Sequence, residues 1–257
     1  MQRTGRIALA MVCCGLIGSC GGGGDNSAFV PTNESPGGIW TGTDQQSGLA
    51  VLGLVTETGR FHFIRDDGTQ YVGTVTTTGM SGSGSFDGFA PLGTTFQDGS
   101  THGTGTVTAT IHQRSSFSAT TQFTTDAGNA NSDSLSMTFD TRYNRASSLA
   151  TISGNYTESG TGTVFTVDAN GLIFAQEPAA IGCVINGTVS IIDARYNAYS
   201  VSVSYASCVG AYAALNGLQL TGLGTLDGSV SPERAIIGLS GASGSTKVAL
   251  VEVLTRS

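Results

Sequence analysis

The sequence holds few residues that could act together as a nucleophile and a base. Two serine-containing segments, GMSGS at 79–83 and GASGS at 241–245, come near the G-x-S-x-G nucleophile pattern but lack its last glycine. Both lie among residues typical of strands and turns, whereas that nucleophile needs a strand, a sharp turn and a following helix. Neither segment predicts a catalytic serine.

The three histidines, His62, His102 and His112, lack the spacing of a metal site. His62 lies between Phe61 and Phe63 and should point to the opposite face of a strand from them. His102 lies in a DGSTHG segment that is typical of a turn. We expect histidines that are solvated or hydrogen-bonded.

Adjacent carboxylates at Asp66 and Asp67 could serve the acid and base steps of glycoside hydrolysis. On a strand they would face opposite ways, and Gly68 follows them, so they are better explained as turn formers. The GGGG run at 21–24 lies in a flexible segment and does not predict a phosphate loop. We predict no catalytic residue, no metal ligand and no cofactor other than a covalent lipid on Cys20, and an enzyme is the least favoured class.

The elements that would position any site are β-strands, because apolar and polar residues alternate through almost the whole chain. In residues 104–113 (TGTVTATIHQ), Val107, Ala109 and Ile111 fall on one face and threonines on the other. Residues 134–143 (SLSMTFDTRY) alternate in the same way, and Asp-Gly and Asn-Gly turn signals separate such runs. The fold class is therefore all-β.

The two halves of the chain resemble each other, with offsets of roughly 112 to 116 residues. SPGGIWTGT is echoed by ATISGNYTE, VTETGRFHF by TVDANGLIF, and QYVGTVT by VINGTVS. About eight strands are expected in each half, the number that closes a small barrel. We predict two tandem antiparallel barrel-like units, 38–147 and 148–257, related by internal duplication. A single large β-barrel or a β-sandwich is the alternative.

Inward-facing residues give a different expectation for each unit. Large side chains predict a packed core in the first unit, whereas the second could hold either a core or a ligand cavity. The residues concerned are Trp40, Phe61, Phe63, Phe123 and Phe139 in the first unit and Tyr199, Val201, Val203 and Tyr205 in the second. Serine and threonine on the outward faces disfavour a barrel embedded in lipid.

The N-terminus has the features of a secreted protein. Arg3 and Arg6 precede a short apolar run within residues 1–19, a pattern typical of a signal peptide and too short for a resident membrane span. Residues 16–20 (LIGSC) resemble the lipobox of bacterial lipoproteins. The resemblance implies that Cys20 is acylated with chains such as palmitate and becomes the new N-terminus.

Residues 20–37 are rich in glycine and lack hydrophobic periodicity, which predicts a flexible leash between a lipid anchor and the folded part. In many Gram-negative lipoproteins an aspartate after the acylated cysteine retains the protein at the inner membrane. Here that residue is Gly21, so the resemblance implies the outer membrane, at its periplasmic face or at the cell surface.

Two more cysteines remain in the mature chain, Cys183 and Cys208. They flank two β-rich runs on either side of residues 195–198, and a hairpin there would bring them nearly opposite. In an oxidising envelope compartment we expect a disulfide. A reactive thiol pair or a metal site is the alternative, although no histidine lies near in sequence.

The GIW segment at 38–40 resembles the G-x-W motif of lipocalins, in which the tryptophan closes the barrel floor against a late arginine. The resemblance implies that Arg142 or Arg145 plays that part. The expected barrel-closing positions are Gly38, Trp40, Gly154 and Tyr156. Tandem barrels on a lipid leash also resemble bacterial surface lipoproteins of the transferrin-binding type, from which we carry over no ligand and no binding residue.

Charge excludes one class of partner. The chain has 11 basic and 18 acidic residues, and removal of Arg3 and Arg6 with the signal leaves 9 − 18 = −9. Such a chain is a poor binder of nucleic acid. We therefore expect a membrane-anchored, non-enzymatic envelope lipoprotein that binds a small apolar ligand or an envelope partner protein. A structural or assembly accessory of an outer-membrane or secretion complex is the alternative.

Overall fold

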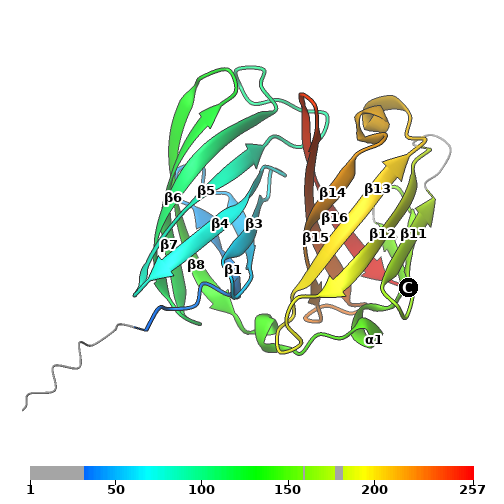
Figure 1. The fold of residues 1–257 in the computed structure, drawn as a ribbon, viewed down its shortest axis with the longest axis horizontal. Coiled ribbons are helices and arrows are strands. Elements are labelled where there is room, and N and C mark those ends of the chain that lie inside the picture. Colours follow the sequence, from blue (N-terminus) through cyan, green and yellow to red (C-terminus); the bar gives the residue numbers. More distant parts are fainter. Residues whose placement is uncertain (1–31, 159, 177–181) are drawn as a thin grey trace, which may run out of the picture. The chain divides into compact units, whose positions relative to one another are not determined.

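The computed structural model describes residues 32–158, 160–176 and 182–257, which form two closed antiparallel β-barrels within one compact unit (Figure 1). Barrel 1 consists of β1 (Gly38–Asp44), β2 (Ala50–Val55), β3 (Arg60–Arg65), β4 (Gln70–Thr78), β5 (Ser81–Phe89), β6 (His102–His112), β7 (Ser116–Thr125) and β8 (Ala130–Asp140). Barrel 2 consists of β9 (Gly154–Glu158), β10 (Val164–Val167), β11 (Leu172–Gln176), β12 (Val184–Ile191), β13 (Tyr199–Ala206), β14 (Gln219–Asp227), β15 (Arg234–Ser243) and β16 (Thr246–Arg256).

Each strand pairs with the next along the chain, and the last strand of each barrel pairs with the first. The prediction of two tandem eight-stranded barrels is therefore confirmed. The described residues also form the short helices η1 (Thr141–Asn144), α1 (Leu149–Ile152) and η2 (Gly210–Leu215). Among the described residues, no helix has the length and apolar character needed to cross a bilayer.

The two barrels repeat a local detail that the sequence echo indicated. Gly59 and Gly171 end equivalent turns with φ angles of 85° and 81°, a region that favours glycine. The amide of Val75 donates to the Gly59 carbonyl at 2.9 Å, and the amide of Val189 donates to the Gly171 carbonyl at 2.7 Å. In barrel 1 the turn between β2 and β3 is thus hydrogen-bonded to β4, and in barrel 2 the equivalent turn between β10 and β11 is hydrogen-bonded to β12.

Aromatic rings fill the end of barrel 1 at which β1 begins and β8 ends. The Trp40 ring lies 5.5 Å from the rings of both Phe117 and Phe139. Glycines on the inner wall make room for such rings, since a Cβ at Gly88 would lie 2.5 Å from the Phe123 ring. The predicted packed core of the first unit is present around these residues.

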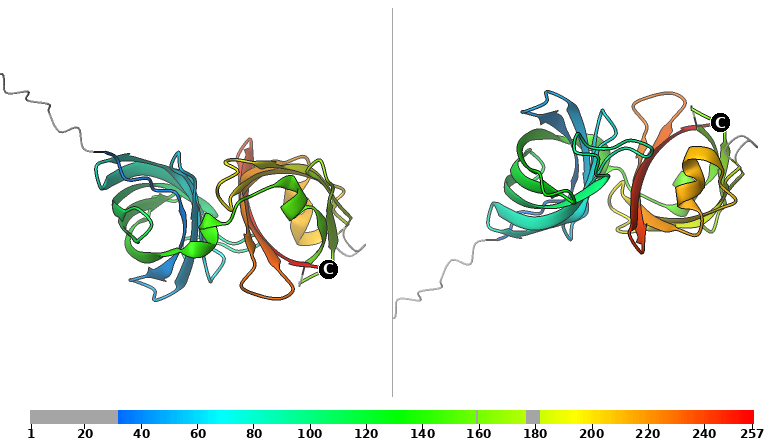
Figure 2. Two further views of the ribbon diagram at one scale, coloured as in Figure 1. Left: turned by 90° about the horizontal axis from the view of Figure 1, so that it is seen from below. Right: turned by 90° about the horizontal axis from the view of Figure 1, so that it is seen from above.

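The described residues of barrel 2 form an apolar core. A small cavity of about 30 Å³ in this core is lined mainly by apolar side chains. Helix α1 lies across one end of the barrel and η2 across the other (Figure 2). Leu215 of η2 and Leu218 after it are buried in the same core as Tyr199 and Tyr205. The sequence left open whether the second unit holds a packed core or a ligand cavity, and the structure shows a packed core.

Candidate functional site

A large cavity opens at the end of barrel 1 that no helix covers. It has a volume of about 830 Å³ and lies where β1, β3, β5 and β7 end and β2, β4, β6 and β8 begin. Its wall combines aromatic, charged and amide side chains, including Arg65, Asp67, Tyr71, Phe96, Asp98, Phe123, Asn129 and Asp133. Ligand pockets of proteins have volumes of about 300–1,000 Å³.

A layer of polar side chains separates this cavity from the aromatic core. Asp44 stands four residues after Trp40, Arg65 two after Phe63, and Asp133 two before Leu135. Side chains two residues apart share one face of a strand. Three strands therefore each place a charged side chain inside the barrel, between the aromatic core and the mouth.

Arg65 is the centre of this layer. Its Nη1 lies 3.2 Å from Oδ2 of Asp44 and donates to the Tyr71 hydroxyl at 3.2 Å, while Nη2 pairs with Asp67 at 2.9 Å. The buried Asp44 also accepts hydrogen bonds from the backbone amides of Gln46 and Ser47. The single guanidinium is thus held in place by two carboxylates and one phenol.

Tyr71 lies near a third carboxylate, that of Asp133. The Tyr71 hydroxyl accepts from Arg65 and interacts electrostatically with the Asp133 side chain. Burial raises the pKa of Tyr71 to about 12, so the phenol is neutral and can donate. Burial, with a contribution from the negative charge of Asp44, raises the pKa of Asp133. The positive charge of Arg65 opposes this rise, although no lysine, arginine or histidine of the described part of the chain lies at ion-pair distance from Asp133.

The segment 90–101 between β5 and β6 forms part of the cavity wall. Phe96 packs against Phe123 with ring centroids 5.5 Å apart. Asp98 accepts hydrogen bonds from the Thr125 hydroxyl at 2.5 Å and from the Asn129 side chain at 2.9 Å. Hydrogen bonds from Ser100, together with those from Thr125 and Asn129, hold the pKa of Asp98 well below its usual range. Asp98 is therefore an ionised anchor for this segment.

The predicted disulfide is present. Cys183 and Cys208 are bridged, with their Cα atoms 4.0 Å apart, at the open end of the β12–β13 hairpin. Val184 pairs with Ala206, so the hairpin places the cysteines opposite each other as the sequence indicated. The acylation predicted for Cys20 lies outside the described residues.

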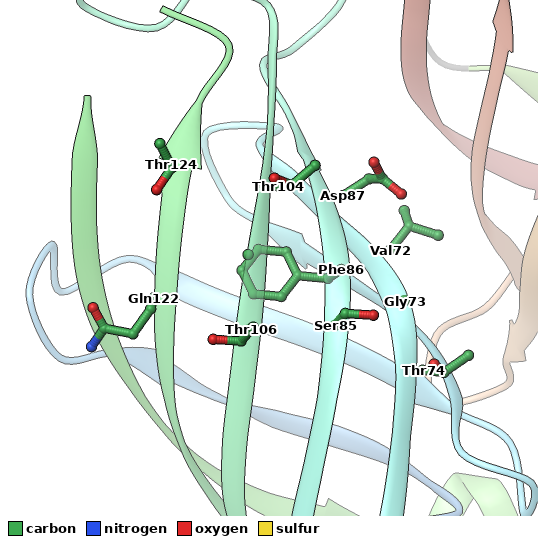
Figure 3. A pocket seen from close by; sticks show the side chains of 11 residues that line it. Val72, Gly73, Thr74, Ser85, Phe86, Asp87, Thr104, Thr106, Gln122 and Thr124 are labelled. Carbon is green, nitrogen blue, oxygen red and sulfur yellow. The ribbon is translucent and has the colours of Figure 1, made fainter. Parts of the chain in front are cut away.

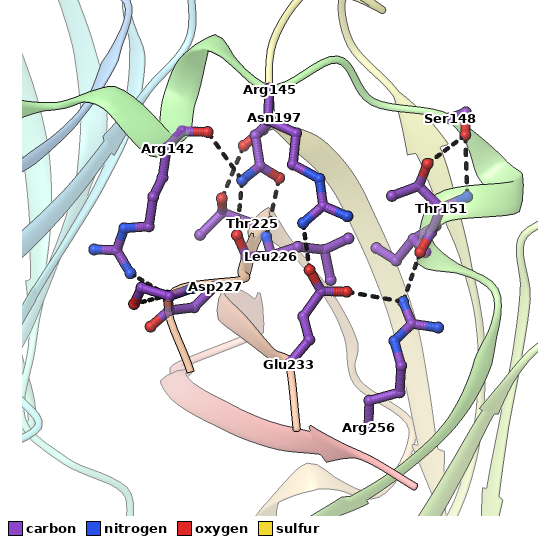
Figure 4. Close-up of polar contacts among 12 residues, drawn as sticks. Arg142, Arg145, Ser148, Thr151, Asn197, Thr225, Leu226, Asp227, Glu233 and Arg256 are labelled. Carbon is purple, nitrogen blue, oxygen red and sulfur yellow. Dashed lines mark hydrogen bonds and ion pairs between the residues drawn. The ribbon is translucent and has the colours of Figure 1, made fainter. Parts of the chain in front are cut away.

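The predicted barrel-closing residues of the first unit lie at the end of barrel 1 opposite the cavity. Trp40 is fully buried, its Nε1 donates to the Pro36 carbonyl at 3.0 Å, and a Cβ at Gly38 would meet its ring. The expectation that Arg142 or Arg145 packs on Trp40 is wrong. Arg142 forms ion pairs with Asp140 and Asp227, and Arg145 pairs with Glu233 (Figure 4). Both arginines therefore form ion pairs with acidic residues on β8, on β14 and just before β15.

In barrel 2, an arginine does close the barrel against the first-strand aromatic residue. Arg256 of β16 lies over the Tyr156 ring at 4.8 Å and donates to the Ser153 carbonyl at 2.8 Å. It also donates to the Thr151 carbonyl at 2.6 Å (Figure 4). A Cβ at Gly154 would lie 2.8 Å from the same guanidinium. The arrangement expected at Gly38 and Trp40 is thus found at Gly154 and Tyr156.

The histidines are hydrogen-bonded or exposed, as expected, and they lie apart from the cavity. His62 faces away from Phe61 and Phe63, is buried, and hydrogen-bonds through Nε2 to the Gln70 side chain at 2.7 Å. His102 does not lie in a turn but begins β6, where pairing with Phe89 of β5 extends the ladder. It is buried between the carboxylates of Asp87 and Asp126. His112 is exposed.

Asp66 and Asp67 occupy the turn between β3 and β4, as predicted. They have different surroundings, because Asp67 lines the cavity and pairs with Arg65 whereas Asp66 is exposed and does not line it. No group of three or more His, Cys, Asp or Glu side chains suited to a metal ion occurs in the part of the chain that the structure describes.

A second hollow, of about 620 Å³, lies on the outer face of β4 to β7. Thr74, Ser85, Thr106 and Gln122 are cross-strand neighbours there, and their side chains project from the sheet (Figure 3). This face is exposed and rich in hydroxyl groups. It therefore differs in chemistry from the charged and aromatic cavity at the barrel mouth.

Sequence reasoning missed the polar layer of Asp44, Arg65, Tyr71 and Asp133. The available signal was a charge at an inward-facing position of a strand, which is costly to bury without a partner. No family model matches this chain, and no curated protein matches it.

Proposed function

We propose that this protein is a lipid-anchored lipoprotein of the bacterial cell envelope that binds a small ligand in the mouth of barrel 1 and catalyses no reaction. The observation that carries the proposal is the contrast between the barrels. Barrel 2 has a cavity of about 30 Å³, whereas barrel 1 has an open one of about 830 Å³. A filled barrel can serve as a scaffold, while an open polar mouth over a rigid core provides a binding site.

The anchor rests on the N-terminal residues. A short apolar run ends in LIGSC, and the glycine-rich segment after it would let the folded part move away from the membrane surface. Cys20→Ser should remove the acylation site and release the protein from the membrane fraction into the soluble periplasmic fraction. Cell fractionation with immunodetection measures this, with Cys13→Ser as the matched control. Unchanged membrane association of Cys20→Ser would refute the anchor.

The binding function is tested by native mass spectrometry of the mature protein purified from its own host, with identification of any molecule it releases. We expect one bound small molecule per chain. Asp133→Asn, which alters the cavity wall without changing its size, should reduce the occupancy. A protein that is empty when purified and takes up no small molecule from a host extract would refute the proposal.

The second candidate is an accessory that docks an envelope complex, and the outer face of barrel 1 favours it. One row across five strands consists of Thr78, Ser81, Thr110, Ser118 and Ser136, all exposed and all uncharged. Exposed faces of soluble proteins normally mix charged residues of both signs. Cross-linking in intact cells would test this role: a partner attached through this face supports it, and no cross-linked partner argues against it.

A further inference from the structure

The proposed ligand-binding function leaves open what the cavity at the mouth of barrel 1 accepts. We propose that its ligand is a small organic cation, whose ammonium group pairs with Asp133 and whose apolar part packs on the aromatic rings beside it. This inference depends on the proposed function and names the chemical class of the ligand.

The fixed charges in the cavity wall leave an excess of negative charge. The lining residues comprise one guanidinium, Arg65, and three carboxylates, Asp67, Asp98 and Asp133, which gives 1 − 3 = −2. The buried Asp44 beside Arg65 adds one more negative charge below the cavity. A cationic ligand would be attracted to such a site and an anionic one repelled.

The carboxylates are not equally available to a ligand. Asp67 pairs with Arg65, and Asp98 accepts from Thr125 and Asn129 and so anchors the cavity wall. Asp133 remains: it is half-buried, faces the interior from β8, and forms no ion pair with any of the described residues. A half-buried carboxylate without a cationic partner is the group that an incoming ammonium would stabilise most.

Arg65 is not available to bind an anion. Its Nη1 and Nη2 groups are engaged by Asp44, Tyr71 and Asp67. Its Nε is buried and has no hydrogen-bond partner in the structure. The positive charge in the wall is therefore already compensated by the protein itself.

Aromatic rings border the same space. Phe123 lies between Tyr71 and Phe96, with ring centroids 6.2 and 5.5 Å away, and all three line the cavity. Such rings attract organic cations through their negative faces and also offer apolar contact area. Carboxylate and rings together favour an organic cation over a metal ion, which would require several oxygen ligands at one point.

The test compares three probes of nearly equal size and different charge: 2-phenylethylamine, 2-phenylethanol and phenylacetate. Isothermal titration calorimetry with the mature protein in non-ionic detergent gives the affinity for each. We expect the amine to bind about tenfold more tightly than the alcohol, and the carboxylate to bind most weakly. An amine that binds no more tightly than the alcohol would overturn the inference without any variant being made.

Asp133→Asn is the matched variant, since it removes the charge and keeps the shape. It should abolish the preference for the amine over the alcohol. Asp66→Asn is the control, because it makes the same change on the exposed side of the β3–β4 turn. Equal loss of amine preference in both variants would show that general charge, rather than Asp133, decides it.

The two proposals fail in different ways. A neutral or anionic molecule released from the host-purified protein would refute the proposal of a cationic ligand and would still support the proposed ligand-binding function. A protein that binds none of the three probes and releases no molecule would overturn both.

Discussion

His62 is expected to make the stability of this protein depend on pH. Its side chain is 1% exposed, on the outer side of β3, beside Leu54, Leu223 and Ile236. Nε2 bonds to the Gln70 side chain, whereas Nδ1 is buried and has no hydrogen-bond partner. The imidazole is therefore neutral with its proton on Nε2. Protonation would add an N–H with no acceptor in apolar surroundings.

Burial lowers the pKa of His62 from 6.5 to about 4, and the positive charge of Arg60 adds to the effect, while the bond to Gln70 opposes it. This lowering of the pKa corresponds to about 3 kcal/mol. Between these two pKa values the unfolded chain binds a proton that the folded chain does not. The stabilisation is therefore complete above pH 6.5 and is lost as the pH falls to about 4.

Urea unfolding at about pH 7.5 and about pH 4 measures this loss. Carboxylates also titrate in this range, so the wild type must be compared with His62→Gln, which keeps a donor for Gln70 and cannot titrate. We expect the variant to lose about 3 kcal/mol less than the wild type on acidification. His112→Gln, at an exposed histidine, is the control and should behave as the wild type.

A ring titration of the wild-type protein by NMR checks the same reasoning by measuring the pKa directly. The Hε1 signal of His62 is assigned as the one missing from the spectrum of His62→Gln. An inflection near pH 6.5 for that signal, or equal acid destabilisation of the wild type and His62→Gln, would refute the argument from burial.

Two further predictions concern stability. Reduction of the Cys183–Cys208 bridge, which spans 25 residues, should lower the free energy of unfolding by about 3 kcal/mol and the melting temperature with it; an unchanged melting curve, with both thiols labelled, would contradict this. Gly59→Ala should cost about 3 kcal/mol, because the new Cβ would overlap the Val75 carbonyl at a φ of 85°. Gly48→Ala, with a φ of 72° and open space around it, should cost only about 1 kcal/mol by the same chemical denaturation, and equal losses would refute the steric argument.

The sequence by itself determined the strands and their grouping into two barrels. Alternation in segments such as 104–113 indicates which side chains face inward, and short turns favour antiparallel pairing of each strand with the next one along the chain. It also located the disulfide, because the hairpin between Cys183 and Cys208 is local and its register follows from its two runs. These properties depend on residues close together in the chain.

The closing arginine and the environment of the histidines required tertiary structure. Arg142 and Arg256 are both basic residues at the end of a barrel, yet one pairs with Asp140 and Asp227 and the other packs on Tyr156. The choice depends on which acidic groups lie within reach in space. The sequence shows that both residues are arginines, but it does not show which acidic or aromatic side chains lie near each of them in space.

Only the tertiary structure brought the candidate site together. Asp44, Arg65 and Asp133 come from β1, β3 and β8, and closure of the barrel places them in one layer. The difference between the open mouth of barrel 1 and the filled barrel 2 is also a tertiary property, since η2 lies across an end of barrel 2 that has no such cover in barrel 1. Alternation shows that a side chain points inward, but the space inside depends on how distant side chains fill it.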